Sequence, residues 1–288
     1  MLFHLTSPAL SGRSLRALGA GVVAVVAMVG AGAGHAAPDA ELWDRWLAHD
    51  PQSSARVDHG AWSRLLATHV RADADRIHRF DYGAVSESDR TQLRIYLDSL
   101  SMTPIGLLRR TEQLAFWINL YNALTVDLVI DHFPVPSIRD IDLSSGLFSD
   151  GPWRRKLAVV DGAPLSLDDI EHRILRPIWS DPRVHYAVNC AALGCPDLAR
   201  EAYTGATVEA MLEAAAARFV NHRRGVSISS DGLVLSSLYD WYAEDFGADD
   251  RAVIDHLIRY ADTDLAAALG QFDAIEGYRY DWRLNRVD

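Results

Sequence analysis

One 21-residue stretch, 111–131, constrains the fold of this chain more than any other part of its sequence. It contains neither glycine nor proline, and no charged residue lies between Glu112 and Asp127. Apolar residues occupy every side of the helix it predicts, with the main stripe formed by Leu114, Trp117, Tyr121, Leu124 and Leu128. A helix that is apolar nearly all round is buried at the centre of a protein. His132-Phe133-Pro134 ends it, because a residue before proline disfavours helical geometry.

A polar stripe runs along the same helix. Glu112, Asn119 and Asn122 share it, because the intervals from Glu112 through Ala115 to the two asparagines are 3, 4 and 3 residues. Buried amides must find partners for both their donors and their acceptors. The stripe therefore predicts either a hydrogen-bond network that ties the helix to the sheet, or the floor of a cleft.

The remainder of the chain predicts an α+β fold. Amphipathic patterns indicate helices in the first half at 38–49, 59–72 and 87–100, the last capped by Ser86. The second half mixes two hairpins (156–166 and 226–236), a strand at 184–189, helices at 167–175, 207–220, 241–246 and 251–269, and an aromatic end at 272–282. We expect a helix-rich N-terminal half and a buried central helix packed on a small antiparallel sheet.

The first 36 residues have the pattern of an export signal. Arg13 and Arg16 precede an uncharged run over 18–29 that is too short and too rich in glycine and alanine for a stable membrane span. Small residues before Ala36 predict cleavage after that residue, with Ala33 as the next choice and an uncleaved anchor as the alternative. The expected organisation is a signal peptide at 1–36, a helical N-terminal extension at 37–84 and an α+β domain at 85–288.

Charge and composition limit the partners. Removing residues 1–36 lowers the formal charge from −11 to −13, and nucleic-acid binding needs a basic face, so no nucleic-acid partner is expected. We see no other long apolar stretch apart from the signal and the central helix. The mature protein is therefore expected to be exported, periplasmic or secreted, without a membrane span, and with an envelope or peptide ligand as the partner considered.

The two cysteines allow two interpretations. In a strand over 184–189, His185 and Asn189 would lie on one face and Cys190 on the other. Cys190 could then use His185 as a base only if the chain turns at the end of the strand. In an exported protein, Cys190 and Cys195 also predict a small-loop disulfide, and an oxidised pair supplies no nucleophilic thiolate. The sequence alone leaves both open.

A third group comprises Glu171 and His172, with Arg176 one turn further along. Glu171, His172, His185 and Glu112 are residue types that bind metals or exchange protons. No metal-ligand spacing such as His-x-x-x-His is present, so neither a metal site nor a cofactor is expected. For His172, a surface or capping position is the preferred interpretation.

Several of these motifs together resemble one known family. They are Glu112-Gln-Leu-Ala-Phe-Trp-Ile-Asn119-Leu-Tyr-Asn122-Ala, Leu167-Asp-Asp-Ile-Glu171-His172, His185-Tyr-Ala-Val-Asn-Cys190 leading to Cys195-Pro196, Trp241-Tyr242-x-x-Asp245-Phe246 and Tyr280-Asp281-Trp282-x-x-Asn285. The pattern is similar to that of domain of unknown function 547, over residues 85–285. The family's activity is not established in general, so the resemblance specifies the domain more than its function.

The order of elements also resembles that of papain-like and transglutaminase-like proteins, in which a buried helix packs on a sheet and a strand histidine faces the helix start. Here the helix carries no cysteine. Two hypotheses follow. The preferred one is a binding or scaffold domain of the cell envelope. The alternative is a cysteine-dependent hydrolase or acyl transferase acting on peptide, amide or envelope substrates, with Cys190 as nucleophile, His185 as base, and Asn119, Asn122 and Glu112 as further candidate site residues.

Overall fold

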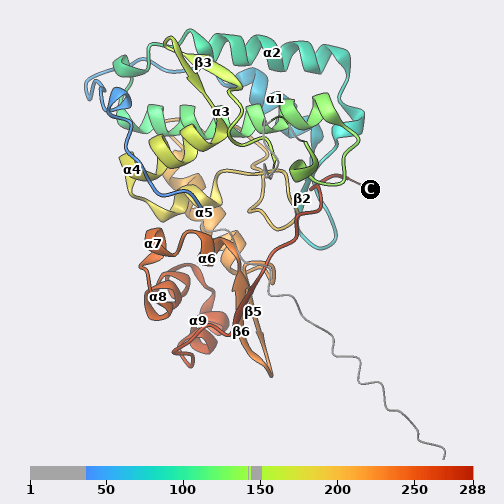
Figure 1. Cartoon of the computed structure of the whole chain (residues 1–288), viewed down its shortest axis with the longest axis vertical. Coiled ribbons are helices and arrows are strands. Elements are labelled where there is room, and N and C mark those ends of the chain that lie inside the picture. The colour runs from blue at the N-terminus through green and yellow to red at the C-terminus, as the bar shows by residue number, and fades with distance from the viewer. Residues whose placement is uncertain (1–36, 142, 144–150, 288) are drawn as a thin grey trace, which may run out of the picture. The chain divides into compact units, whose positions relative to one another are not determined.

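Helix α3, Arg110–His132, lies at the centre of the fold, where the sequence predicts it. The computed structural model describes residues 37–141, 143 and 151–287, so the predicted signal peptide lies outside the described residues. Before α3 come α1 (Gly60–His69), the hairpin strands β1 (Val70–Ala72) and β2 (His78–Phe80), and α2 (Glu87–Ser101), with short 3-10 helices at Asp44–Trp46, Tyr82–Ala84 and Ile105–Leu107 (Figure 1).

The second half alternates short strands with helices. After a 3-10 helix at Ile138–Asp140 it contains β3 (Ala158–Val160), β4 (Ala163–Leu165), a π-helix over Asp169–Leu175 that continues into α4 (Arg176–Trp179), a 3-10 helix at Pro182–Tyr186, and α5 (Val208–Val220). It ends with β5 (Val226–Ser229), β6 (Gly232–Ser236), α6 (Leu238–Trp241), α7 (Ala243–Phe246), α8 (Asp250–Tyr260), α9 (Thr263–Leu269) and β7 (Gly277–Arg279).

The described strands form three small sheets, which confirms the α+β class. Strands β1 and β2 pair antiparallel, as do β3 and β4, where Asp161 and Gly162 both adopt positive φ in the turn. The third sheet has the order β5-β6-β7, and β7 adds to β6 in parallel. The β3–β4 and β5–β6 hairpins agree with the turn signals Asp161-Gly162 and Asp231-Gly232, respectively.

Helix α3 is held mainly by other helices. It packs against α2, the π-helix and α5, rather than lying principally on a sheet as the sequence suggested. Among the described helices, α3 alone is long and apolar enough to cross a membrane, but its side chains are buried inside the protein. The apolar surface of α3 explains both its membrane-like composition and its burial, because a helix that is apolar on all sides needs packing partners on all sides.

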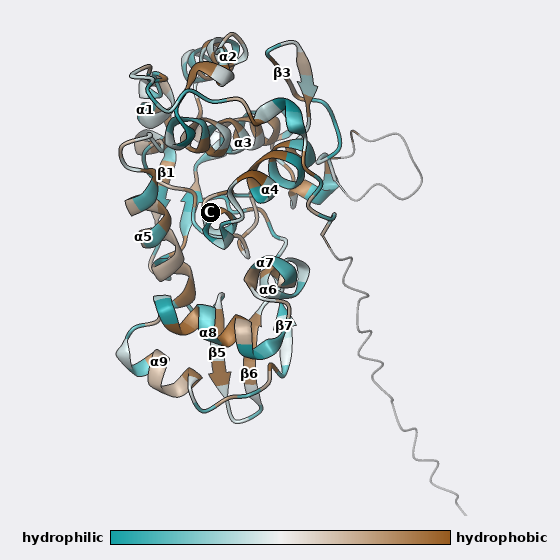
Figure 2. Cartoon of the chain, turned by 90° about the vertical axis from the view of Figure 1, so that its left-hand side faces the viewer, coloured by the Kyte–Doolittle hydropathy of each residue, from teal (hydrophilic) through white to brown (hydrophobic). Residues whose placement is uncertain are grey.

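A second hydrophobic cluster lies around the last sheet. Leu233 and Leu235 of β6 contact side chains of α5 and α8, and Tyr186, Tyr239 and other aromatic rings fill the space between them. Figure 2 shows β5 and β6 coloured as hydrophobic where they lie beside α8. The described residues all fall within one compact unit, His35–Asp288, and the predicted boundary between 84 and 85 stays a prediction.

Four predicted elements differ from the structure. The helix predicted at 59–72 ends at His69, and Val70–Ala72 form strand β1. The helix predicted at 38–49 is wrong except for the turn Asp44–Trp46, because the backbone N–H groups of Glu41 and Trp43 bond to carbonyls of another segment. The strand predicted at 184–189 is wrong: Asp181 accepts from the Arg183 N–H and Pro182 occupies the first turn, so a 3-10 helix forms. The helix predicted at 251–269 is broken at Asp262, which caps α9.

The capping box predicted at Ser166 is confirmed and supplies a test of the local energetics. The Ser166 hydroxyl accepts from the Asp169 N–H at 3.2 Å, and the Asp169 carboxylate accepts from the Ser166 N–H at 2.8 Å. Ser166→Ala should lower the free energy of unfolding by about 1–2 kcal/mol, measured by denaturant titration. Ser227→Ala in strand β5 caps no helix and should change stability by less than about 0.5 kcal/mol. Equal effects of the two variants would contradict the cap.

Candidate functional site

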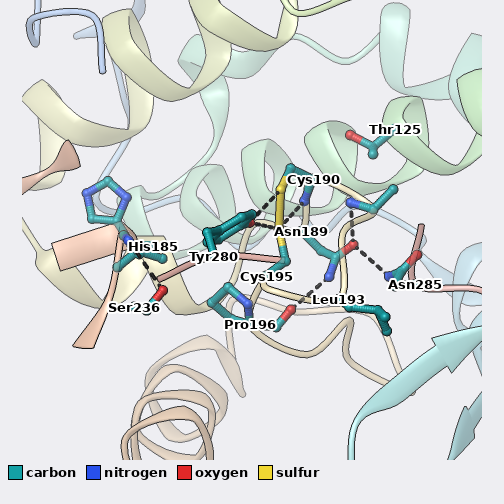
Figure 3. Close-up of a disulfide and its surroundings, with 12 residues drawn as sticks. Thr125, His185, Asn189, Cys190, Leu193, Cys195, Pro196, Ser236, Tyr280 and Asn285 are labelled. Carbon is teal, nitrogen blue, oxygen red and sulfur yellow. Dashed lines mark hydrogen bonds between the residues drawn. A yellow bond between two sulfur atoms is a disulfide. The ribbon is translucent and has the colours of Figure 1, made fainter. Parts of the chain in front are cut away.

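Cys190 and Cys195 form a disulfide at the centre of the candidate site. Their Cα atoms lie 6.2 Å apart, and the Cys190 N–H donates to the Cys195 sulfur at 3.0 Å. The Tyr280 hydroxyl lies 3.1 Å from the Cys190 sulfur and 3.0 Å from that of Cys195 (Figure 3). The structure thus agrees with the disulfide interpretation.

The C-terminal segment lies over the disulfide loop. Leu193 and Gly194 donate their N–H groups to the carbonyls of Arg283 and Asp281, both at 2.8 Å. A Cβ on Gly194 would lie 2.8 Å from the Asp281 nitrogen and 3.0 Å from the Tyr280 ring, so only glycine allows this approach. The loop is also held by Asn189, whose amide donates to the Pro196 carbonyl at 2.7 Å.

His185 is buried between two carboxylates, with 1% of its surface exposed. Its Nε2 lies 2.7 Å from Asp245, and its Nδ1 lies 3.6 Å from Glu171. The ring of Tyr242 packs on the imidazole with centroids 3.9 Å apart. In the view of Figure 3, the Tyr280 ring lies between His185 and the disulfide. The histidine therefore faces acids, and no hydrogen bond joins it to either sulfur among the described residues.

Arg176 completes this charged cluster. Its guanidinium donates to both oxygens of Asp245, at 2.6 and 3.2 Å, and to the backbone carbonyl of Pro38 at 2.6 Å. It also lies over the Tyr242 ring, 5.1 Å from the centroid. The bidentate pairing fixes the orientation of Asp245, and through it that of the imidazole.

A π-helix places Glu171 in the cluster. Residues 169–175 adopt this rare geometry, in which each backbone N–H bonds to the carbonyl five residues earlier. The backbone N–H of Arg176 donates to the Glu171 carbonyl in this way. The next bond of this kind would need the N–H of Pro177, which has none, so the π geometry ends there. Wider turns of this kind are frequent at functional sites, because they alter which side chains share a face.

The charges of the cluster stabilise one another. Burial opposes the imidazolium of His185, but the hydrogen bond to Asp245 and the nearby Glu171 outweigh it, so its pKa is raised. Burial likewise opposes ionisation of Glu171 and Asp245, yet His185 and, for Asp245, Arg176 hold both pKa values low, that of Glu171 at about 2. The cluster thus places two basic side chains, His185 and Arg176, against the carboxylates of Glu171 and Asp245.

Asp168 differs from its neighbours in the cluster. Burial and the charge of Glu171 raise its pKa to about 6, although Arg154 lies 3.6 Å away. Nearby, the His172 side chain bonds to Arg176, 3.1 Å from its Nδ1, and is buried rather than at the surface. A carboxyl group held near its titration point beside a buried histidine is a typical feature of functional sites.

The polar stripe of α3 is paired with backbone. Asn119 donates to the Tyr203 carbonyl at 2.7 Å and accepts from the Tyr203 N–H at 3.0 Å. Asn122 donates to the Ala187 carbonyl at 2.9 Å and accepts from the Asn189 N–H at 2.8 Å. These bonds fit the predicted network, with loops taking the place of the sheet.

Glu112, at the start of the helix, is also paired with backbone groups. Its carboxylate accepts from the N–H groups of Val57 at 2.9 Å and Gly205 at 3.1 Å. A Cβ on Gly205 would lie 2.2 Å from this carboxylate, so the contact requires glycine. Of the sequence candidates, Asn122 reaches the 187–189 backbone between His185 and Cys190. Asn119 and Glu112 bond to other loops.

Sequence reasoning missed the roles of Asp245, Tyr242 and Tyr280. Asp245 lies 60 positions from His185, and nothing local connects the two. The only available signal was the motif Trp241-Tyr242-x-x-Asp245-Phe246, which contributed to the family resemblance without suggesting a role. Arg176 was grouped with Glu171 and His172 in the sequence, and the structure confirms that these three residues lie together.

Comparison with known proteins agrees with this picture. Residues 105–220 match the family described as "Protein of unknown function, DUF547". Over these residues the chain is similar to this family. The matched region holds α3, the π-helix, His185 and both cysteines, whereas Tyr242, Asp245 and Tyr280 follow it. Searches of curated proteins and of solved structures returned no match.

The described residues contain no group of three or more histidine, cysteine, aspartate or glutamate side chains that could hold a metal ion. A hollow of about 690 Å³ lies between α1 and α5 and is lined by residues such as Arg64, His78, Arg200 and Arg218. None of its lining residues belongs to the His185 cluster.

The network on α3 predicts a measurable loss of stability. Asn119→Leu leaves both the N–H and the carbonyl of Tyr203 without partners in a buried place, and should lower the free energy of unfolding by roughly 1–3 kcal/mol. Gln92→Leu, at an exposed position of α2, is the matched control and should change it by less than about 0.5 kcal/mol. An Asn119→Leu protein as stable as wild type in chemical denaturation would contradict a buried network.

The raised pKa of Asp168 predicts a pH-dependent gain in stability. The folded pKa of about 6 lies above the ordinary aspartate value of 3.8, so ionised Asp168 destabilises the fold above pH 6, and protonation removes this penalty as the pH falls. Asp168→Asn should therefore stabilise the protein by roughly 1–2 kcal/mol at pH 7–8. The gain should shrink below pH 6 and vanish near pH 4.

Thermal melts across this pH range would measure the effect. Asp98→Asn, exposed on α2, is the control and should show no such trend. A loss of stability in Asp168→Asn at pH 7 would mean that the ionised carboxylate supports the fold through Arg154 or His172.

Proposed function

We propose that the protein is exported and that its DUF547 domain is a binding or scaffold domain of the cell envelope. The observation that carries this proposal is the Cys190–Cys195 disulfide. Disulfides persist in oxidising compartments outside the cytoplasm, and two cysteines in such a loop pair there. The export-signal pattern of residues 1–36, ending at Ala36, supports the same compartment.

The geometry favours binding over thiol catalysis. Both sulfurs are used in the disulfide, and Cys195 is buried beneath Tyr280. His185 faces Asp245 and Glu171, and no hydrogen bond joins it to either sulfur among the described residues. The alternative, a cysteine-dependent hydrolase or acyl transferase, would need the disulfide reduced and His185 freed from its carboxylates.

The stability of this arrangement also suits a scaffold. The backbone amides and carbonyls around the site are tied down by Asn122, Asn189 and Asn285, which link α3, the disulfide loop and the C-terminal segment. Such a network limits movement of the loop, and a rigid surface loses less conformational entropy when it binds a ligand.

Mass spectrometry of protein isolated from outside the cytoplasm would test the proposal. We expect a chain that starts at Ala37 and whose Cys190 and Cys195 resist alkylation under denaturing, non-reducing conditions. Reduction should release two thiols, because the pair is closed by a disulfide.

Two outcomes would overturn parts of this proposal. An intact 1–36 segment on the recovered protein would end the cleaved-export interpretation. Rapid alkylation of Cys190 in the native protein, slowed by His185→Ala without unfolding, would favour the thiol enzyme, because the thiolate is the reactive form.

A further inference from the structure

Pro177 leaves two backbone carbonyls open on the segment that carries Glu171. In π geometry the His172 carbonyl would accept from residue 177, and in α geometry the Arg173 carbonyl would accept from the same residue. Proline has no N–H, so neither bond can form. Buried carbonyls are almost always paired, so these two acceptors need donors from elsewhere.

The donors come from the start of the described chain. The N–H groups of Glu41 and Trp43 donate to the carbonyls of His172 and Arg173, both at 3.0 Å. N–H groups two residues apart point the same way only in an extended chain. Residues 37–43, here named the N-terminal strap, therefore attach to the helix as an added strand attaches to the edge of a sheet.

Side chains of the helix complete the contact. Arg176 donates to the Pro38 carbonyl, and the Arg173 guanidinium lies over the Trp43 ring, 4.6 Å from its centroid. The two carbonyls and these two arginines form one acceptor strip. Since Arg176 also holds Asp245, the strip is joined directly to the His185 cluster.

The strap is bound in a way that another peptide can imitate. The side chains of Asp39, Ala40 and Leu42 are exposed. Glu41 is also exposed, and its carboxylate lies 3.8 Å from the Arg173 guanidinium, so backbone bonds, this ion pair and the Trp43 ring supply the contact. Recognition through the backbone tolerates many sequences. If export removes residues 1–36, the strap becomes a free chain end, and ends of this kind open more readily than core elements.

We propose that the acceptor strip on helix 167–179 is a peptide-binding site that the N-terminal strap occupies in cis. Its ligand is an extended polypeptide segment with two N–H groups two residues apart, an aromatic residue at the second, and a carbonyl three residues before the first. The proposal rests on the proposed binding function and names its ligand class.

A fluorescent peptide with the sequence of residues 37–44 tests the site by fluorescence anisotropy with the whole mature chain. A tethered strap competes at an effective concentration in the millimolar range, so the wild-type chain should bind the peptide weakly. Replacing Glu41→Pro and Trp43→Ala in the chain removes an N–H donor, the carboxylate that pairs with Arg173, and the ring. This double variant should bind the peptide at least about tenfold more tightly.

Matched controls identify the contacts. Leu42→Pro, added to the wild-type chain, removes an N–H that makes no bond to the strip and should leave peptide binding at the wild-type level. A peptide carrying Glu41→Pro should bind the double variant at least about tenfold more weakly than the native peptide. No gain in the folded double variant, or equal binding of the two peptides, would overturn the proposal.

Hydrogen exchange keeps the test decisive if the double variant fails to fold. In the wild-type chain, the amides of Glu41 and Trp43 should exchange through local opening, well before those of α3. Exchange of these amides only with global unfolding would show that the strap is a permanent part of the fold. Because purified protein is used, neither result depends on export or on the alkylation outcome.

Discussion

Helix α3 imposes the condition that organises the rest of the structure: every polar group on a fully buried helix must be paired. Asn119, Asn122 and Glu112 meet it by bonding to backbone of loops at 203, 187–189, 57 and 205. The loop before Cys190 is therefore fixed from beneath by the helix. Tertiary contacts that satisfy a buried side chain thus also position the candidate site.

The charged cluster also depends on pairing, and here an unpaired buried group would cost more because the groups carry full charges. His185 and Arg176 would be unfavourable as isolated buried cations, and Glu171 and Asp245 as isolated buried anions. Together they compensate one another, which raises the pKa of His185 and lowers the pKa values of both carboxylates. Asp168, excluded from this balance, retains a raised pKa. The four charges of the cluster are therefore compensated by one another, whereas an ionised Asp168 lowers the stability of the fold.

Pro177 connects local chain chemistry with recognition. By ending the π-helix it leaves carbonyls that the N-terminal strap fills, and the strap in turn touches the arginine that holds Asp245. A ligand that displaced the strap would act on the cluster through this single side chain. The disulfide, under Tyr280 and the C-terminal segment, keeps the opposite side of the site rigid.

Local chemistry made part of this protein predictable. The apolar stretch 111–131 determined the central helix, Asp161-Gly162 a hairpin, and Ser86 and Ser166 two helix starts, because each depends on neighbours within a few residues. The Cys190–Cys195 disulfide was one of two interpretations that the sequence left open, and the structure agrees with it.

Only the tertiary structure decided the rest. That Asp245 faces His185, and that Tyr280 covers the sulfurs, depends on residues 60 to 90 positions apart. The segment predicted as a helix at 38–49 forms only one 3-10 turn, because the N–H groups of Glu41 and Trp43 bond to carbonyls of a distant helix. Amphipathic spacing records which face a segment can bury, whereas its partner and its final geometry are selected by the packing of the whole chain.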